Sequence, residues 1–299
     1  MKVLLDLLDE LDCNYIVGEC MSRHTTMKVG GKADVILFPH SEEVICSVMA
    51  CAKANGIPLT VIGNGSNLLV SDSGIRGAVL CIGEEMSDVR LLDDGVIYAQ
   101  AGASLMKVCK FALKQGLSGM EFAYGIPGSC GGAAFMNAGA YGGEMKDVLY
   151  RCDHVDADGQ KGCIENEALQ LSYRHSAYET NGCIITGIYL KLSKGDKKGI
   201  KCKMDDLLAR RKSKQPLEYP SAGSTFKRPE GYFAAALIEE CGLKGKTCGG
   251  AMVSEKHSGF VINFDHATCG DVMDLCRQIQ ATVLEKKGID LEMEVRTIE

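Results

Sequence analysis

The stretch "GIPGSCGGAAFMNAGAYGG", residues 125–143, places seven glycines in nineteen positions, separated mainly by small and apolar residues and Asn137. Glycine weakens ordinary helices and strands, so this density indicates a segment that something must approach with no side chain between. Three interpretations stay open on these residues alone. The segment could cradle a phosphate, form a bed for the flat ring of a cofactor, or make a tightly packed turn.

A second glycine loop, "GNGSN" at residues 63–67, lies sixty residues earlier between two apolar runs that predict strands. Backbone N–H groups in such a turn can converge on an anion, as in a pyrophosphate site. The loop differs from the dinucleotide-binding fingerprint because it has no G-x-G-x-x-G and no long helix directly after it. Two separated glycine loops suit a long ligand with a diphosphate and a flat ring. Close packing of two lobes is the structural alternative.

Composition favours a globular protein of two or three domains. The chain has 299 residues, of which 24% are charged and 46% hydrophobic. A net charge of −6 disfavours nucleic acid as a partner. No apolar run approaches the roughly 18 residues of a membrane span, and residues 1–13 predict an amphipathic helix rather than a signal peptide. No feature indicates an obligate protein partner.

The fifteen cysteines include no C-x-x-C pair, and most lie among apolar neighbours. There an unpaired cysteine serves as a small hydrophobic side chain. The odd count and the spacing predict a reducing, cytoplasmic location and no metal site.

The pattern along the chain predicts three consecutive parts. Residues 1–73 form an α/β lobe, with a helix over 41–55 that is capped by Ser41. Residues 74–200 form a second lobe, with a hairpin turn at Asp94–Gly95 and an amphipathic helix over 105–115. A basic polar link, 194–224, leads into a third part, 201–299. It contains two helices, the second capped by Thr268, short strands and a terminal strand over 289–298.

Three residues could carry chemistry, and each has a structural alternative. Arg174 in "LSYRHSAYE" could clamp a carboxylate bidentately, or form an ordinary ion pair. Ser224 in "YPSAGSTFKRP" could donate a proton or help bind an oxyanion, or a serine of this loop could simply cap a helix. Glu294 could act beside Arg296, or lie on an exposed face of the last strand. A hydrolase is disfavoured because the chain has no G-x-S-x-G elbow.

Seven segments, in order, resemble one family, the UDP-N-acetylenolpyruvoylglucosamine reductases. They are "HTTMKVGG" (24–31), "VIGNGSNLLVSD" (61–72), "GLSGMEFAYGIPGSCGGAAFMNAGAYGGEM" (116–145), "LSYRHSAY" (171–178), "KQPLEYPSAGSTFKRP" (214–229), "KHSGFVIN" (256–263) and "EVRTI" (294–298). The chain resembles the branch with a compact substrate domain. The reason is that the loop "YPSAGSTFKRP" (219–229), here called the serine loop, follows "KQP" with no long insertion between them. Cys130 departs from the pattern where a small aliphatic residue is expected, and Arg228 stands where another branch has asparagine.

The resemblance implies an α+β protein: a two-lobed FAD-binding fold of the vanillyl-alcohol-oxidase type plus a C-terminal α/β substrate-binding domain. FAD is expected to bind noncovalently, with the 63–67 loop on its pyrophosphate. The implied cofactor-binding residues are Gly63, Asn64, Gly65, Ser66, Asn67, Gly125, Gly128, Ser129, Gly131, Gly132, Asn137, Gly139, Ala140 and Tyr141.

The implied reaction has two halves and belongs to bacterial peptidoglycan precursor synthesis. NADPH first reduces the flavin. The enolpyruvyl ether of UDP-N-acetylglucosamine then receives the hydride and becomes UDP-N-acetylmuramate. By motif match Ser224 donates the proton, while Arg174 and Glu294 bind and polarise the carboxylate. A glutamate there must be protonated or paired, so a raised pKa is expected. The implied substrate-binding residues are Tyr173, Lys214, Lys227 and Arg228.

Two alternatives remain at this point. Another FAD-dependent oxidoreductase of the same fold, acting on a small alcohol or sugar, would share both glycine loops. It would have no reason to keep "SAGSTFK" together with Arg174 and Glu294. A nucleotide-binding module without catalysis would tolerate loss of Ser224 or Glu294, yet both are present.

Overall fold

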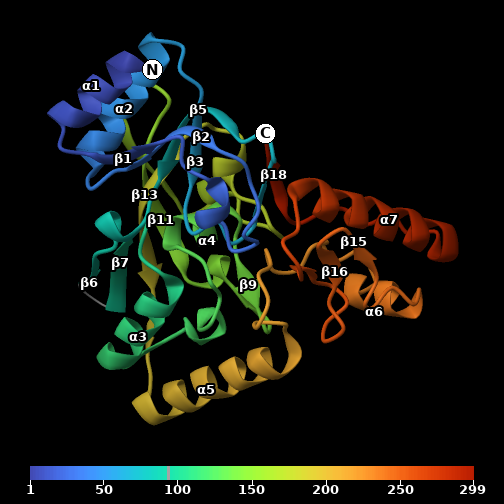
Figure 1. The fold of residues 1–299 in the computed structure, drawn as a ribbon. Coiled ribbons are helices and arrows are strands. Elements are labelled where there is room, and N and C mark those ends of the chain that lie inside the picture. Colours follow the sequence, from blue (N-terminus) through green and yellow to red (C-terminus); the bar gives the residue numbers. More distant parts are fainter. Residues whose placement is uncertain (93–94) are drawn as a thin grey trace. The chain divides into compact units, whose positions relative to one another are not determined.

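The computed structural model describes residues 1–92 and 95–299 and divides into two compact units (Figure 1). Unit 1 comprises Met1–Val17, Val35–Asn64 and Gly77–Arg210, and unit 2 comprises Gly18–Asp34, Gly65–Arg76 and Arg211–Glu299. These units do not follow the predicted boundaries after residues 73 and 200. Segment 65–76 belongs with the C-terminal residues because β18 (Arg296–Ile298) pairs in parallel with β4 (Leu68–Val70). Segment 18–34 is joined to them by hydrogen bonds from Thr26 to Ser221 and from Asn263 to Met27. The assignment of residues 1–73 and 74–200 to the two FAD-binding lobes, and of 201–299 to the substrate domain, stays a prediction.

The first sheet of unit 1 has the strand order β1-β2-β5-β3. Its strands are β1 (Asn14–Val17), β2 (Ala33–Phe38), β5 (Ile75–Cys81) and β3 (Leu59–Ile62), and it is joined by α1 (Lys2–Glu10) and α2 (Glu42–Ala54). The predicted N-terminal helix and the helix over 41–55 are both confirmed. The Ser41 hydroxyl accepts the Val44 N–H, as an N-cap should. Figure 1 shows α1 and α2 side by side.

The second sheet of unit 1 is antiparallel, in the order β12-β11-β13-β7-β6. Its strands are β6 (Val89–Leu91), β7 (Val96–Gln100), β11 (Leu149–Val155), β12 (Lys161–Glu165) and β13 (Ile184–Lys191). The antiparallel pairing of β6 with β7 confirms the predicted hairpin, although Asp94 of its turn lies outside the described residues. The remaining elements are α3 (Leu105–Gln115), α4 (Cys130–Phe135), β8 (Leu117–Ser118), β9 (Gly139–Ala140), β10 (Gly143–Glu144) and β14 (Ser193–Lys194).

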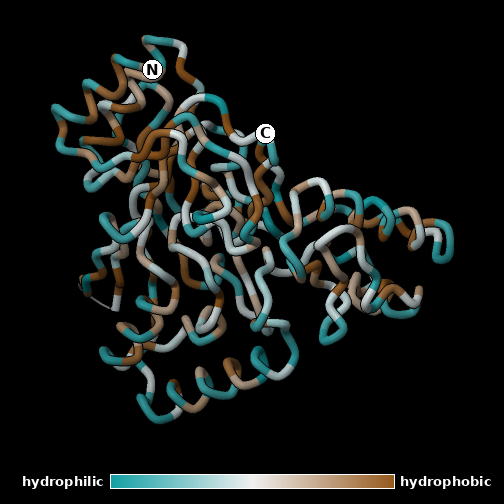
Figure 2. The backbone as a smooth tube through the Cα atoms, viewed as in Figure 1, coloured by the Kyte–Doolittle hydropathy of each residue, from teal (hydrophilic) through white to brown (hydrophobic). Residues whose placement is uncertain are grey.

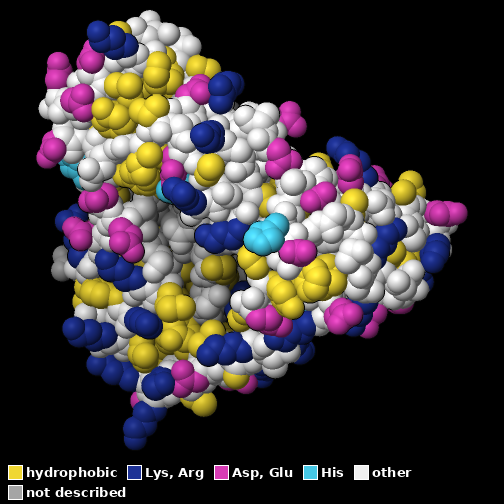
Figure 3. Space-filling view, viewed as in Figure 1, with side chains coloured by type: hydrophobic (Ala, Val, Ile, Leu, Met, Phe, Trp, Pro, Cys, Tyr) yellow, Lys and Arg dark blue, Asp and Glu magenta, His cyan; other side chains and the backbone are white. Residues whose placement is uncertain are grey.

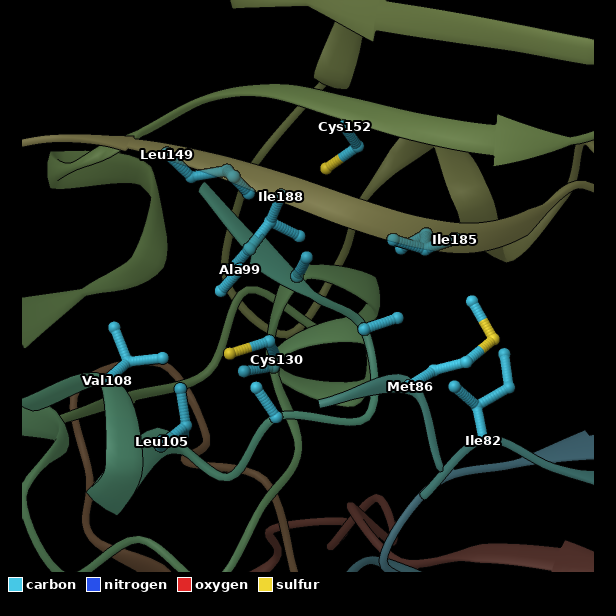
Figure 4. Packing of buried hydrophobic residues seen from close by; sticks show 14 of the residues in the cluster. Ile82, Met86, Ala99, Leu105, Val108, Cys130, Leu149, Cys152, Ile185 and Ile188 are labelled. Carbon is cyan, nitrogen blue, oxygen red and sulfur yellow. The ribbon is translucent and has the colours of Figure 1, made fainter. Parts of the chain in front are cut away.

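One hydrophobic core serves both sheets of unit 1. In Figure 4, Cys130 of α4 lies between Leu105 and Val108 of α3 on one side and Ala99 and Ile188 of the sheet on the other. Cys130 is fully buried, and burial raises the pKa of its thiol far above the ordinary value. It therefore serves as a small apolar residue, which is the role the sequence predicted for most of the cysteines.

Unit 2 contains a three-stranded antiparallel sheet, two helices and the β18–β4 pair. Its elements are β15 (Thr247–Cys248), β16 (Ala251–Val253), β17 (Val261–Asn263), α6 (Ala234–Glu240) and α7 (Cys269–Lys287). Thr268 and Asp271 form the predicted capping box of α7. A separate hydrophobic core lies beneath α7, with Val272, Leu275 and Ile279 buried.

The predicted terminal strand over 289–298 is wrong in length, because only Arg296–Ile298 forms a strand. The chain changes partner near Val295. Before it, the Lys227 N–H donates to the Glu292 carbonyl at 2.8 Å, and after it β18 pairs with β4. The prediction that Leu291 and Val295 lie on the apolar face still holds, because both side chains are buried. Glu294 therefore lies where the backbone turns from one partner to the other.

The link over 194–224 is not irregular, because most of it forms α5 (Lys197–Lys214). Ile200, Met204 and Leu207 are buried at helical spacing, which is a signal that the high charge obscured. An i,i+4 ion pair, Lys201 with Asp205, supports the exposed face. Figure 2 shows α5 largely hydrophilic with apolar residues recurring along it, and Figure 3 shows basic side chains over α3 and α5.

Candidate active site

The first residue of the 63–67 loop, Gly63, meets the glycine-rich segment inside unit 1. A Cβ atom on Gly63 would lie 2.3 Å from the Ser129 hydroxyl oxygen. No side chain can occupy position 63 while Ser129 keeps this place. The loop that follows β3 and the segment 125–143 are therefore neighbours, as both the ligand interpretation and the close-packing interpretation require.

Residues 128–132 are fastened to residues 101–105 by backbone hydrogen bonds of 2.8–3.0 Å. A Cβ on Gly131 would lie 2.9 Å from the Ala101 methyl carbon, so close packing explains this glycine. Ser129 is buried and caps α4, accepting the Gly132 N–H at 3.4 Å. Residues 128–132 of the glycine-rich segment are therefore held in place by backbone hydrogen bonds and packing. Its predicted role in cofactor binding stays a prediction.

The same segment ends in a hairpin, β9–β10, whose two-residue turn is Tyr141–Gly142. Both turn residues have left-handed backbones, with φ of +54° for Tyr141 and +85° for Gly142. A left-handed tyrosine costs about 1–2 kcal/mol, and strain of this kind concentrates at functional sites. Gly143 is required by packing, because its Cβ would lie 2.8 Å from the Phe122 ring.

Asn137 is fully buried and its side chain makes three hydrogen bonds. Its amide nitrogen donates to the Glu144 carboxylate and to the Ser172 carbonyl, each at 2.9 Å, and its oxygen accepts the Lys146 N–H at 2.8 Å. Both amide protons are thus used within the protein. The Asn137 side chain therefore has no amide proton left to donate to the cofactor.

Arg174 lies at the tip of a tight turn. Ser172 and His175 exchange backbone hydrogen bonds of 3.2 and 3.1 Å, leaving Tyr173 and Arg174 between them. Arg174 has a left-handed φ of +56°, and its guanidinium lies 5.1 Å from the centre of the Tyr173 ring. Through Ser172, this turn is attached to Asn137 and hence to the glycine-rich segment.

Ser224 and Glu294 come together in unit 2. Glu294 donates its N–H to the Thr225 carbonyl at 2.8 Å, so Glu294 faces the residue after Ser224. Thr225 is itself buried and held by two bonds of 2.9 and 2.8 Å, to Val261 and Gly259. Both predicted catalytic side chains are half-buried. The structure assigns Arg174 to unit 1 and these two residues to unit 2.

The loop 63–67 offers backbone donors. The N–H groups of Asn64, Gly65, Ser66 and Asn67 form no hydrogen bond within residues 1–92 and 95–299. Gly65 has a φ of +59°, and its Cβ would lie 2.1 Å from the His24 carbonyl oxygen, so only glycine fits. Successive open N–H groups around a left-handed glycine form an anion-binding concavity. These residues fit the pyrophosphate of the expected FAD.

The predicted substrate cations occupy different settings in unit 2. Lys227 forms an ion pair with Glu292, whose side chain is 72% exposed. Such an exposed pair contributes little to the stability of the fold. The Arg228 guanidinium lies 4.4 Å from the centre of the Phe233 ring, and Lys214 is exposed at the end of α5.

Two side chains near the candidate residues were not singled out from the sequence. Thr26 donates its hydroxyl to the Ser221 carbonyl at 2.6 Å in unit 2. Ser176 is fully buried in unit 1 and donates to the Phe135 carbonyl at 2.6 Å. Both belong to motifs quoted above, but hydroxyl-to-carbonyl contacts over long sequence separations leave no spacing signal.

Within the described part of the chain, no helix is long and apolar enough to cross a membrane. The same residues contain no group of three His, Cys, Asp or Glu side chains arranged to hold a metal ion.

Two family models match the chain in separate regions. The model described as "FAD binding domain" matches residues 33–161. The model described as "UDP-N-acetylenolpyruvoylglucosamine reductase, C-terminal domain" matches residues 215–298.

Individual proteins extend the similarity over nearly the whole chain. A UDP-N-acetylenolpyruvoylglucosamine reductase from Clostridium botulinum (strain Hall) is 50% identical over 286 residues, covering 95% of this chain and 92% of the relative. The crystal structure of such a reductase from Thermus caldophilus matches with a TM-score of 0.81 and 34% identity, covering 96% and 99% of the two chains. A BBE-like protein of Physcomitrella patens, 15% identical with a TM-score of 0.50, covers 64% of this chain and 44% of its own, and is similar in fold alone.

Proposed function

The chain belongs to the UDP-N-acetylenolpyruvoylglucosamine reductase family, and from this premise we propose how its own residues divide the work. It is an FAD-containing, NADPH-dependent oxidoreductase of peptidoglycan precursor synthesis, a UDP-N-acetylmuramate dehydrogenase. It has the two-lobed FAD-binding fold of the vanillyl-alcohol-oxidase type and a C-terminal substrate-binding domain. The alternative of an oxidase for a small alcohol or sugar is disfavoured by 50% identity to a reductase.

The net reaction adds a hydride and a proton across the carbon–carbon double bond of the enolpyruvyl ether, while NADPH becomes NADP⁺. When bound, FAD supplies the hydride relay from NADPH to the terminal methylene carbon. The protein must bind the cofactor, place the double bond, stabilise the charge that develops toward the carboxylate, and deliver the proton to the ether-bearing carbon.

We propose that the 63–67 loop binds the pyrophosphate of FAD through its backbone. The open N–H groups of Asn64 to Asn67 support this role, since phosphate oxygens need several donors at once. Residues 125–143 would lie along the cofactor, with Gly128 and Gly132 keeping side chains out of the way.

We propose that Ser224 delivers the proton and that Arg174 and Glu294 bind the carboxylate end of the substrate. The observation that carries this proposal is the bond from the Glu294 N–H to the Thr225 carbonyl, which places Glu294 beside the serine loop. A positively charged Arg174 stabilises negative charge as it accumulates on the carboxylate. Ser224 regains its proton from solvent after each turnover.

The remaining substrate contacts are assigned by chemistry. Lys214, Lys227 and Arg228 are cations for the UDP diphosphate, and Tyr173 is an exposed ring that can contact the sugar or the carboxylate. We propose that residues 1–73 and 74–200 act as the two FAD-binding lobes and 201–299 as the substrate domain. We also propose a cytoplasmic location, since all fifteen cysteines are thiols and seven of them are buried.

The test separates the two half-reactions under anaerobic conditions. The purified protein should show flavin absorbance, lose it on titration with NADPH, and regain it on addition of the enolpyruvyl sugar nucleotide. Ser224→Ala should leave reduction by NADPH nearly unchanged and slow reoxidation by about a hundred- to ten-thousandfold. Ser221→Ala, in the same loop, is the matched control. A colourless protein that FAD cannot reconstitute would overturn the proposal, and equal damage to both halves would remove Ser224 from its role.

A further inference from the structure

Thr26 makes two hydrogen bonds that join separate segments of unit 2. Its N–H donates to the Gly65 carbonyl at 3.1 Å, and its hydroxyl donates to the Ser221 carbonyl at 2.6 Å. The hydroxyl oxygen is also 3.5 Å from the Gly65 carbonyl, but its single proton belongs to the shorter contact. One half-buried side chain therefore connects the predicted phosphate loop with the segment that leads to Ser224.

Asn67 makes the second connection, from the other end of the same loop. Its side-chain amide donates to the Glu294 carbonyl at 3.0 Å, and its own carbonyl accepts the Arg296 N–H at 3.0 Å. Because Glu294 also donates to Thr225 at 2.8 Å, its backbone is held on both sides. Asn67 thus fixes the one residue of the terminal segment that is assigned to the substrate.

The contacts close a circuit of hydrogen bonds within unit 2. It runs from residues 65–67 through Thr26 to Ser221, along the serine loop to Thr225, across to Glu294, and back through Asn67. Two side chains, those of Thr26 and Asn67, complete it. All other steps are chain connectivity or backbone hydrogen bonds.

The serine loop needs such support because one of its residues, Gly223, is not restrained by packing. Gly223, directly before Ser224, has a φ of +79° and no atom within 4 Å of where its Cβ would lie. The position of Ser224 is therefore set at the two ends of the loop. Thr225 is buried and fastened at one end, and Ser221 receives the Thr26 hydroxyl at the other. A misplacement of about 1 Å in a reacting group can reduce a rate about 100-fold.

We propose that Thr26 and Asn67 are positioning residues, which hold Ser224 and Glu294 at fixed places relative to the phosphate loop 65–67. Ser224 and Glu294 are then held at fixed distances from the site proposed for the cofactor pyrophosphate. This inference rests on the roles proposed above for Ser224 and Glu294.

The first test compares three single-atom changes in neighbouring threonines. Thr26→Val removes the hydroxyl that reaches Ser221, while Thr26→Ser keeps it. Thr25→Val is the matched control, because Thr25 is 2% exposed and its hydroxyl donates to the Val29 carbonyl at 3.0 Å rather than to either loop. Stopped-flow absorbance gives the rates of flavin reduction and reoxidation, and fluorescence quenching gives the affinity for FAD.

Thr26→Val should slow reoxidation by the enolpyruvyl substrate about 10- to 100-fold. Flavin reduction by NADPH and the FAD affinity should change by less than about twofold, because the Thr26 N–H still reaches Gly65. Thr26→Ser should restore reoxidation, and Thr25→Val should lower the thermal midpoint while leaving the ratio of the two rates unchanged. Asn67→Ala should also slow reoxidation, because it removes the amide that holds the Glu294 carbonyl.

Three outcomes would overturn the inference: equal slowing of both half-reactions, failure of Thr26→Ser to rescue, or the same loss in Thr25→Val. Failure of the proposed function is recognised separately. If Ser224→Ala itself leaves reoxidation unchanged, the assignment of Ser224 is at fault. If Ser224→Ala slows reoxidation and neither Thr26→Val nor Asn67→Ala does, the positioning role alone is wrong.

Discussion

The side-chain amide of Asn137 donates a 2.9 Å hydrogen bond to the Ser172 carbonyl, from a position with no exposed surface. Ser172 opens the turn that carries Arg174, so this bond fastens the turn to the glycine-rich segment. Asn137 also has a left-handed φ of +43°, a conformation that asparagine tolerates better than most residues.

Asn137→Ala should lower the free energy of unfolding by about 3 kcal/mol, because it strands buried polar partners and places alanine in a left-handed backbone. Denaturant titration measures this loss. Asn181→Ala is the control. Asn181 is exposed and its side-chain oxygen accepts the Cys183 N–H at 2.9 Å, so its replacement should cost about 0.5 kcal/mol. Equal losses for the two variants would show that the Asn137 contacts contribute nothing beyond an ordinary surface bond.

At position 174 the left-handed backbone should make arginine less stable than glycine. Arg174→Gly and Arg174→Ala both remove the guanidinium, but only glycine relieves the φ of +56°. The glycine variant should therefore be more stable than the alanine variant by about 1 kcal/mol, measured by thermal unfolding. Both variants should keep flavin reduction by NADPH and lose reoxidation by the enolpyruvyl nucleotide. Loss of FAD binding in either variant would instead make Arg174 a structural residue.

Gly63 and Gly65 should respond differently to alanine. At Gly63 the new methyl meets the Ser129 hydroxyl, which can rotate away at the cost of its cap on α4, about 1 kcal/mol. At Gly65 it meets the His24 carbonyl at 2.1 Å, a backbone atom that cannot rotate, and φ is +59°. Gly65→Ala should therefore weaken FAD binding far more than Gly63→Ala, as fluorescence titration would show. Ser129→Gly should rescue Gly63→Ala and leave Gly65→Ala unchanged.

Local features of the fold were predictable because they depend on neighbouring residues. Ser41 and Thr268 mark helix starts by side chains that reach only three positions ahead. The apolar spacing of Val272, Leu275 and Ile279 marks a buried helix face. The helix α5 was missed because its charge dominates its composition, although Ile200, Met204 and Leu207 carry the period.

The division into units was not predictable, because it depends on pairing between distant segments. β4 and β18 are separated by more than two hundred residues, and their parallel pairing places residues 65–76 with the C-terminal unit. The same pairing limits the terminal strand, since Val295 must bend for the chain to change partner. In the candidate site, the family resemblance indicated the roles of Arg174, Ser224 and Glu294. The contacts of Thr26 and Asn67 could not be predicted, because each joins residues that lie far apart in the sequence.

The carboxyl group of Glu121 should make the stability of the protein depend on pH. Burial by itself raises the pKa of this carboxyl, but hydrogen bonds from the Ser118 hydroxyl at 2.7 Å and the Gly119 N–H at 3.1 Å outweigh it, with Lys203 of α5 3.6 Å away. The pKa of Glu121 therefore lies below its ordinary value. A carboxyl with a lowered pKa stabilises the folded state above the unfolded pKa and loses that contribution as the pH falls through the folded value.

Glu121→Gln should therefore be less stable than the unmodified protein at neutral pH, by about 1–3 kcal/mol. The difference should shrink as the pH falls through the lowered pKa of Glu121, because protonation removes the same charge from the unmodified protein. Denaturant titrations at a series of pH values measure both curves. Glu10→Gln, at an exposed position at the end of α1, should leave the curve at neutral pH unchanged. A difference for Glu121→Gln that stays constant from neutral to acidic pH would mean that the Glu121 charge does not stabilise the fold.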